Sequence, residues 1–109
     1  MKITFVATLV LLAGLATGHS QTAQEPSVQP KDGFVPNAKT AVIIGEAVLI
    51  PVYGEKQIEL ERPFKATLQG DVWTVEGTLN CDAPFCHGGT ALVKISKVSG
   101  QILFMAHYK

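Results

Sequence analysis

The stretch NCDAPFCHGG, which runs from Asn80 to Gly89, concentrates the residue types that could do chemistry. It contains both cysteines of the chain, Cys81 and Cys86, and places His87 directly beside the second one. Three arrangements are open to these side chains: a disulfide across a short loop, a metal site, or a redox-active pair of thiols. The compartment in which the protein works bears on the choice, because disulfides persist in oxidising spaces and are rare in the cytosol.

The N-terminus predicts export. Lys2 supplies a positive charge, residues 3–16 form an almost unbroken apolar run, and small residues follow at a cleavage position. A membrane-spanning helix needs about 20 apolar residues, and the polar residues that follow cut this run short. We therefore expect a secretory signal peptide over residues 1–20, cleaved after Gly18 or Ser20. The mature protein would then lie in a bacterial periplasm, with no stable membrane anchor.

In that compartment the cysteine pair favours a structural disulfide. Closing a loop of about six residues restricts the unfolded chain by roughly 2 kcal/mol. A zinc site would need four ligands, whereas Cys81, Cys86 and His87 supply three, so His107 would have to be the fourth. The spacing also differs from that of zinc-binding cysteine pairs and of thioredoxin-type motifs. We predict a disulfide between Cys81 and Cys86, in preference to a metal site or a redox pair, and we expect no cofactor.

Composition and charge narrow the class of partner. Beyond residue 20 the chain has eight basic and nine acidic residues, because Lys2 is the only charged residue before that point. The sequence shows no basic cluster for nucleic acid and no polybasic stripe for a membrane surface. Residues 21–33 are polar and rich in proline and glutamine, which predicts a flexible linker. We expect one domain over residues 34–109, with a modest core.

The first apolar segment of this domain predicts a helix. Asn37 is a strong N-cap residue, and the apolar residues from Ala38 to Ile50 recur at spacings of three and four. Nearly every face of such a helix is apolar, so we expect it to be well buried. Pro51 predicts a kink or an end of the helix, and Gly54 is a natural left-handed terminator.

The rest of the domain changes to the two-residue period of strands. Short turns and one longer loop separate these segments, which implies an antiparallel meander with the helix covering its apolar face. We expect Trp73 and Tyr53 to belong to the core. The fold class is α+β, with one main buried helix packed on a curved antiparallel sheet of about four strands. The strands are expected at residues 64–69, 72–79, 90–98 and 101–108.

The order of these elements resembles the NTF2 fold immunity proteins of bacterial polymorphic-toxin and contact-competition systems. The resemblance covers residues 33–109. It rests most on Pro-Val-Tyr-Gly-Glu at 51–55, Trp-x-Val-x-Gly-x-Leu at 73–79, and Gly88-Gly89 before the third strand. It implies a small NTF2-like cone that neutralises a toxin by binding it, with no catalysis of its own. The chain ends in His107-Tyr108-Lys109, where members of the family often end in His-Gly-Lys.

An immunity protein must be present where its toxin acts, so the export signal implies a toxin of the cell envelope, such as a cell-wall hydrolase. Protein interfaces favour aromatic anchors, which points to Phe85 and His87 in the predicted disulfide loop. The acidic residues Glu55, Glu59 and Glu61 could meet a basic patch on the toxin and speed encounter. We predict these five residues as candidates for partner binding.

Two other functions remain open. A small NTF2-like enzyme would need an acid or a base inside an apolar pocket, and the candidates are Glu46, Glu76 and His107. Each of them is more simply explained as a residue that faces solvent. A PepSY-like periplasmic inhibitor module is similar at residues 97–102, where the chain has a Lys-x-x-Gly-x-Ile hairpin. Residues 53–73 separate the two binding interpretations, because only the immunity protein would use them in one continuous sheet with the C-terminal strands.

Overall fold

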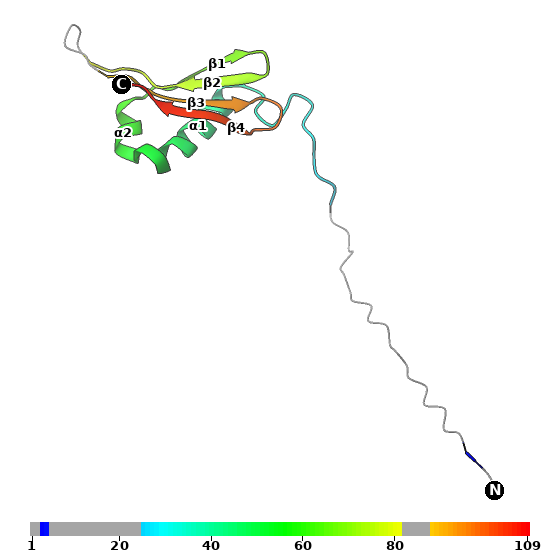
Figure 1. Cartoon of the computed structure of the whole chain (residues 1–109). Coiled ribbons are helices and arrows are strands. Elements are labelled where there is room, and N and C mark those ends of the chain that lie inside the picture. Colours follow the sequence, from blue (N-terminus) through cyan, green and yellow to red (C-terminus); the bar gives the residue numbers. More distant parts are fainter. Residues whose placement is uncertain (1–2, 5–24, 82–87) are drawn as a thin grey trace.

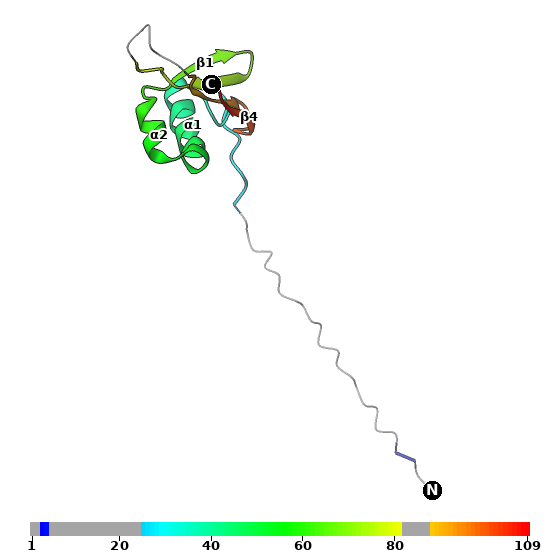
Figure 2. The ribbon, with the colours of Figure 1, turned by 60° about the vertical axis from the view of Figure 1, so that its left-hand side comes forward.

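A computed structural model describes residues 3–4, 25–81 and 88–109 (Figure 1). The described elements are the helices α1 (Ala38–Tyr53) and α2 (Glu55–Leu60), followed by the strands β1 (Lys65–Gln69), β2 (Val72–Glu76), β3 (Ala91–Ser96) and β4 (Ile102–His107). These strands form an antiparallel sheet in the order β1-β2-β3-β4. Both helices lie on one side of it (Figure 2). The predicted α+β fold, with one main helix on a four-stranded antiparallel sheet, is confirmed.

Helix α1 has the two caps that the sequence predicts. The Asn37 side chain accepts a hydrogen bond from the backbone N–H of Thr40 at 2.9 Å, which satisfies a donor in the first turn. At the other end Gly54 has a φ of +93°, and its N–H donates to the carbonyl of Ile50 at 2.8 Å. A residue with a side chain rarely adopts this φ, so glycine fixes the end of the helix.

The proline in α1 does not end the helix. Pro51 lies in its last turn, and the helix continues to Tyr53 and ends at the predicted terminator Gly54. Of the kink or end predicted for Pro51, the end is therefore wrong. Proline removes one N–H donor, whose acceptor in a regular helix would be the carbonyl of Ala47. Ala47 is exposed, and water can therefore replace the missing donor.

The expectation that α1 is well buried holds for one face of the helix only. Ala41, Gly45 and Leu49 are buried, but Ile43 is 60% exposed and Val52 is 59% exposed. A helix packed on a single sheet has only one covered face, and no described element covers the outer face of α1 at these two residues.

The chain between α1 and β2 also differs from the prediction. Residues 55–60 form the short helix α2, which the sequence analysis did not predict, and only β1 joins the sheet with the C-terminal strands. The second strand ends at Glu76 and not at Leu79, because the chain turns away there and the N–H of Thr78 donates to the carbonyl of Glu61 at 2.7 Å.

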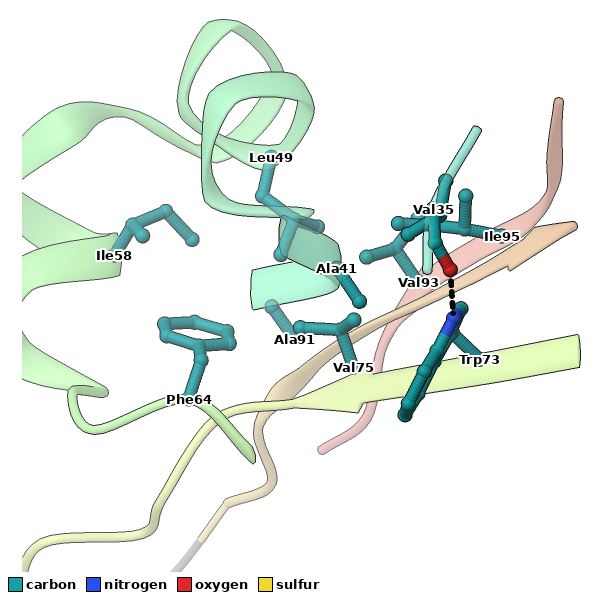
Figure 3. Packing of buried hydrophobic residues seen from close by; sticks show 10 residues of the cluster. All are labelled: Val35, Ala41, Leu49, Ile58, Phe64, Trp73, Val75, Ala91, Val93 and Ile95. Carbon is teal, nitrogen blue, oxygen red and sulfur yellow. Dashed lines mark hydrogen bonds between the residues drawn. The ribbon is translucent and has the colours of Figure 1, made fainter. Parts of the chain in front are cut away.

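The apolar core lies between α1 and the sheet (Figure 3). Gly45 allows close packing, since a Cβ at this position would lie 2.8 Å from a methyl carbon of Val75. Trp73 is buried, as predicted, and its indole N–H donates to the carbonyl of Val35 at 2.7 Å. Tyr53 is partly buried against the cluster. The fully buried core residues include Val35, Ala41, Leu49, Ile58, Val75, Ala91, Val93 and Ile95.

The predicted division into signal peptide, linker and domain stays a prediction, because most of residues 1–24 lie outside the described residues. Within the part of the chain that the structure describes, no helix has the length and apolar character to cross a membrane.

Candidate functional site

The side chain of Glu61, just after α2, points into the interior of the protein. The residue is only 4% exposed. Its Oε1 accepts a hydrogen bond from the backbone N–H of Ala91 at 2.6 Å. Its Oε2 accepts from Nε2 of Gln57 at 2.9 Å and lies 2.9 Å from Nε2 of His107. A buried carboxylate is costly unless such donors replace its water. We call Gln57, Glu61, Ala91 and His107 the Glu61 cluster.

Two glycines allow the chain to close around this cluster. A Cβ on Gly77 would lie 3.0 Å from the Cβ of Glu61, so a side chain there would push the two segments apart. A Cβ on Gly89 would lie 2.4 Å from the carbonyl oxygen of Tyr108, which no real contact permits without a shift. Both glycines belong to the short motifs noted in the sequence, and both stand where the chain approaches itself at the end of the sheet.

His107 joins the last strand to the helices. Its Nε2 faces the Glu61 carboxylate, and its Nδ1 lies 2.9 Å from the carbonyl oxygen of Tyr108. Both neighbours are acceptors, so the ring donates both bonds together only when it carries two protons. The ring of Tyr53 packs against it, with centroids 5.4 Å apart and planes tilted by 55°. The histidine thus ties the end of β4 to the last residue of α1 and to the segment after α2.

The donors around Glu61 also set its charge. Burial raises the pKa of its carboxyl, but the hydrogen bonds from Gln57, the Ala91 N–H and His107, together with the charge of His107, outweigh burial and lower the pKa below the usual 4.5. A carboxylate that already accepts from several donors and has a lowered pKa is a poor general base. The cluster is therefore better suited to holding three segments together than to moving protons.

A pocket of about 330 Å³ opens to solvent beside the Glu61 cluster. It is lined by α2, by Thr78 and Leu79 after β2, by the end of β4, and by Asn80 and Gly88, which stand on the two sides of the cysteine loop. The side chain of Asn80 donates to the carbonyls of Leu60 at 3.1 Å and Arg62 at 2.6 Å, which anchors the start of that loop to the region of α2. Within the described residues, no group of three or more His, Cys, Asp or Glu side chains is placed to hold a metal ion.

The loop candidates lie outside the described residues. This applies to Phe85 and His87, and also to Cys86, so their partner contacts and the disulfide to Cys81 stay predictions. The structure does place the two ends of the loop at the rim of the pocket, because Asn80 and Gly88 both line it.

The acidic candidates separate into two kinds. Glu55 and Glu59 are exposed on α2, and a role in partner binding stays a prediction for them. Glu61 is buried, so its expected place on an exposed acidic surface is corrected. Its carboxylate accepts hydrogen bonds from donors inside the protein, and its part in partner binding stays a prediction.

The residues weighed for catalysis do not assemble into one site. Glu46 pairs with Arg62 at the side of α1. Glu76 is exposed and stands opposite Lys65 in the sheet, as the simpler interpretation predicts. His107 meets Glu61, a contact that the sequence analysis missed, as it missed Gln57 and the Ala91 N–H. The signal available was the set of short motifs, since Tyr53 packs against His107, Gly77 lies close to Glu61, and Gly89 lies close to Tyr108.

The fold and the site define a small α+β domain whose buried polar cluster links three chain segments. The chain belongs to the NTF2 fold immunity protein family, whose family model matches residues 40–109. No curated protein and no solved structure matches the chain. The predicted family is confirmed. Immunity proteins of this kind are typically non-catalytic and have a cognate toxin as partner, so the match favours this function over a PepSY-like module or a small enzyme.

Proposed function

We propose that this chain is an exported immunity protein that binds a toxin acting in the cell envelope and blocks it by occlusion. The single observation that carries the proposal is the family match over residues 40–109. The location is supported by the sequence alone: a positive charge, an apolar run and small residues at the N-terminus, and a closely spaced cysteine pair suited to an oxidising space.

The toxin-binding surface in this proposal is the rim of the pocket beside the Glu61 cluster, together with the exposed side of α2. Two features support it. The loop that carries Phe85 leaves and re-enters the fold at this rim, at Asn80 and Gly88. Glu55 and Glu59 stand one helical turn apart on α2 and are exposed, so their charges can attract a basic patch. The Glu61 cluster underneath keeps the rim in one geometry.

Neutralisation is tested with the toxin encoded by the neighbouring reading frame, exported to the periplasm of a host cell. Co-expression of the full chain should restore survival. A matched variant without residues 2–18 keeps the domain but stays in the cytosol, and it should fail to protect. Protection by the cytosolic variant alone would reject an envelope toxin while leaving the immunity function intact, whereas no protection by either would count against the immunity function for this toxin.

The surface is tested by reversing charge on α2. The double variant Glu55→Lys and Glu59→Lys should slow association with the toxin at least about tenfold at low salt, and the difference should shrink as salt is added. Glu76→Lys is the matched control, because this glutamate is also exposed but belongs to β2. Equal association rates for the two variants would place the interface elsewhere.

The disulfide is tested on protein recovered from the periplasm. Alkylation before reduction should leave Cys81 and Cys86 unmodified, and alkylation after reduction should label both. Labelling of both before reduction would exclude the disulfide without touching the proposed binding surface.

A further inference from the structure

We infer that the outer edge of β4 pairs with β4 of a second copy of this chain, so that the sheet continues through a symmetric dimer. This inference concerns self-association and does not rest on the proposed function. In the order β1-β2-β3-β4 the last strand has a neighbour on one side only. Helix α1 packs mainly on β1, β2 and β3, and it meets β4 near the end of that strand, where the ring of Tyr53 packs against His107. Figure 1 shows β1 and β4 at opposite margins of the sheet.

The side chains of β4 are mostly apolar, as in a strand that has a neighbour on both sides, although β4 is an edge strand. Ile102 is 36% exposed, Leu103 47% and Phe104 45%. From Ile102 to Ala106 the strand has no charged residue. Lys94 lies over the Phe104 ring at 5.8 Å, but it belongs to β3 and approaches from the paired side. Edge strands that must stay single usually carry charges that prevent pairing, and β4 lacks this protection.

The backbone of β4 has free hydrogen-bonding groups on its outer side. Tyr108 donates to the carbonyl of Thr90 at 3.1 Å, which fixes the phase of the ladder between β3 and β4. Because bonding alternates along an antiparallel pair, the N–H and C=O groups of Met105 and His107 point away from β3. Outside the ladders of the sheet, neither makes a backbone bond to another described residue. A register shift between Lys94 and Ile95 confines the regular outer edge to residues 104–107.

A second copy fits this edge because the strand is complementary to itself. A two-fold axis pairs β4 antiparallel with its mate, and any charge near the axis would then face the same charge. From Ile102 to Ala106 the strand has no ionisable residue, and the ring of His107 is directed at Glu61 within its own copy. The opposite edge offers no such match, since β1 begins with Lys65 and exposes Thr67 and Gln69.

The pairing has a geometric consequence. With the axis perpendicular to the sheet, both copies of α1 lie on the same side, and the two β4 strands lie next to each other between them. Each copy thereby supplies a neighbour for the outer edge of the other's β4. The side chains of Leu103 and Phe104, half-exposed in one copy, lose further surface to water, and this loss drives association.

The test measures molar mass by light scattering after gel filtration, on protein made from the full sequence, with the chain mass fixed by mass spectrometry. We expect twice the chain mass at micromolar concentration. Leu103→Lys should weaken the dimer at least about tenfold. Thr67→Lys is the matched control, since it puts the same charge on the other edge strand, and it should leave the dimer intact. Circular dichroism establishes that both variants fold.

Amide hydrogen exchange gives a second readout that needs no variant. In the dimer the N–H groups of Met105 and His107 are bonded to the mate, so their exchange should slow as protein concentration rises. A single chain mass at all concentrations, or a dimer broken by Thr67→Lys and not by Leu103→Lys, would overturn the inference. Slow exchange at Met105 that appears only when a toxin is added would also overturn it, because a strand of the toxin would then occupy the edge.

Discussion

Two parts of the interior hold the helices to the sheet by different physics. In the apolar core, Leu49, Val75 and Val93 are fully buried within a cluster of apolar residues. In the Glu61 cluster, a buried carboxylate is matched by three donors. Apolar burial scales with area and has no preferred direction, whereas hydrogen bonds fix direction and depend on protonation. The core therefore supplies most of the stability, and the cluster fixes how three chain segments meet at the pocket.

The largest expected effect belongs to the core. Leu49→Ala removes a fully buried side chain beneath α1, and the lost burial plus the cavity should cost about 2–5 kcal/mol of unfolding free energy. Leu60→Ala makes the same change at a residue that is 62% exposed on α2, and its cost should be within about 0.5 kcal/mol. Urea unfolding of both variants measures the difference. Equal losses of unfolding free energy in the two variants would show that Leu49 of α1 does not contribute to the core.

The next effect belongs to the Glu61 cluster. Glu61→Ala leaves the buried N–H of Ala91 without its acceptor, and one such group costs about 1–3 kcal/mol. Glu59→Ala is the matched control, because that glutamate is exposed two residues earlier, and it should change stability little. The variant should also free the end of β4, so the Nε2–H signal of His107 in NMR spectra should be lost. A stable variant with an unchanged His107 signal would contradict the assigned contact.

The apolar core could be predicted from the sequence to a larger extent than the Glu61 cluster. The core followed from local patterns, since Val93 and Ile95 alternate along one strand and Trp73 and Val75 along another. Strand alternation needs no knowledge of distant residues. The cap at Asn37 was found in the same way, because an N-cap acts within its own turn.

The Glu61 cluster could not be predicted in this way. Glu61 and His107 are 46 residues apart, and the Ala91 donor is a backbone group that no side-chain pattern marks. Glu55, Glu59 and Glu61 were grouped because they are close in sequence. In a helix, residues four apart share a face, whereas a residue two further on points elsewhere. That spacing already separates Glu61 from the other two, although α2 itself was not predicted.

A third prediction compares a buried polar contact with an exposed one. Asn37→Ala removes the acceptor for the backbone N–H of Thr40 at the start of α1. Water can reach this donor, so the loss should be about 1 kcal/mol and below that of Glu61→Ala. Asn37→Ser retains a side-chain acceptor and should recover most of the loss. If the alanine variant lost more stability than Glu61→Ala, the contrast between buried and exposed polar groups would fail.

The smallest expected effect is the response to acid, because protonation removes only the charge of Glu61 and leaves its side chain in place. The pKa of this carboxyl is lower in the folded protein than the usual 4.5. Between the two values the unfolded chain binds more protons, so stability rises with pH there. The contribution of Glu61 is therefore complete above the unfolded value and is lost as pH falls through the folded one. Glu61→Gln has no such titration, so its melting temperature should fall less than that of the unchanged protein on going from neutral pH to below 4.5. If melting temperature changed with pH equally in both proteins, the donors would not favour the charged carboxylate. The stability that the cluster provides would then not depend on the protonation of Glu61.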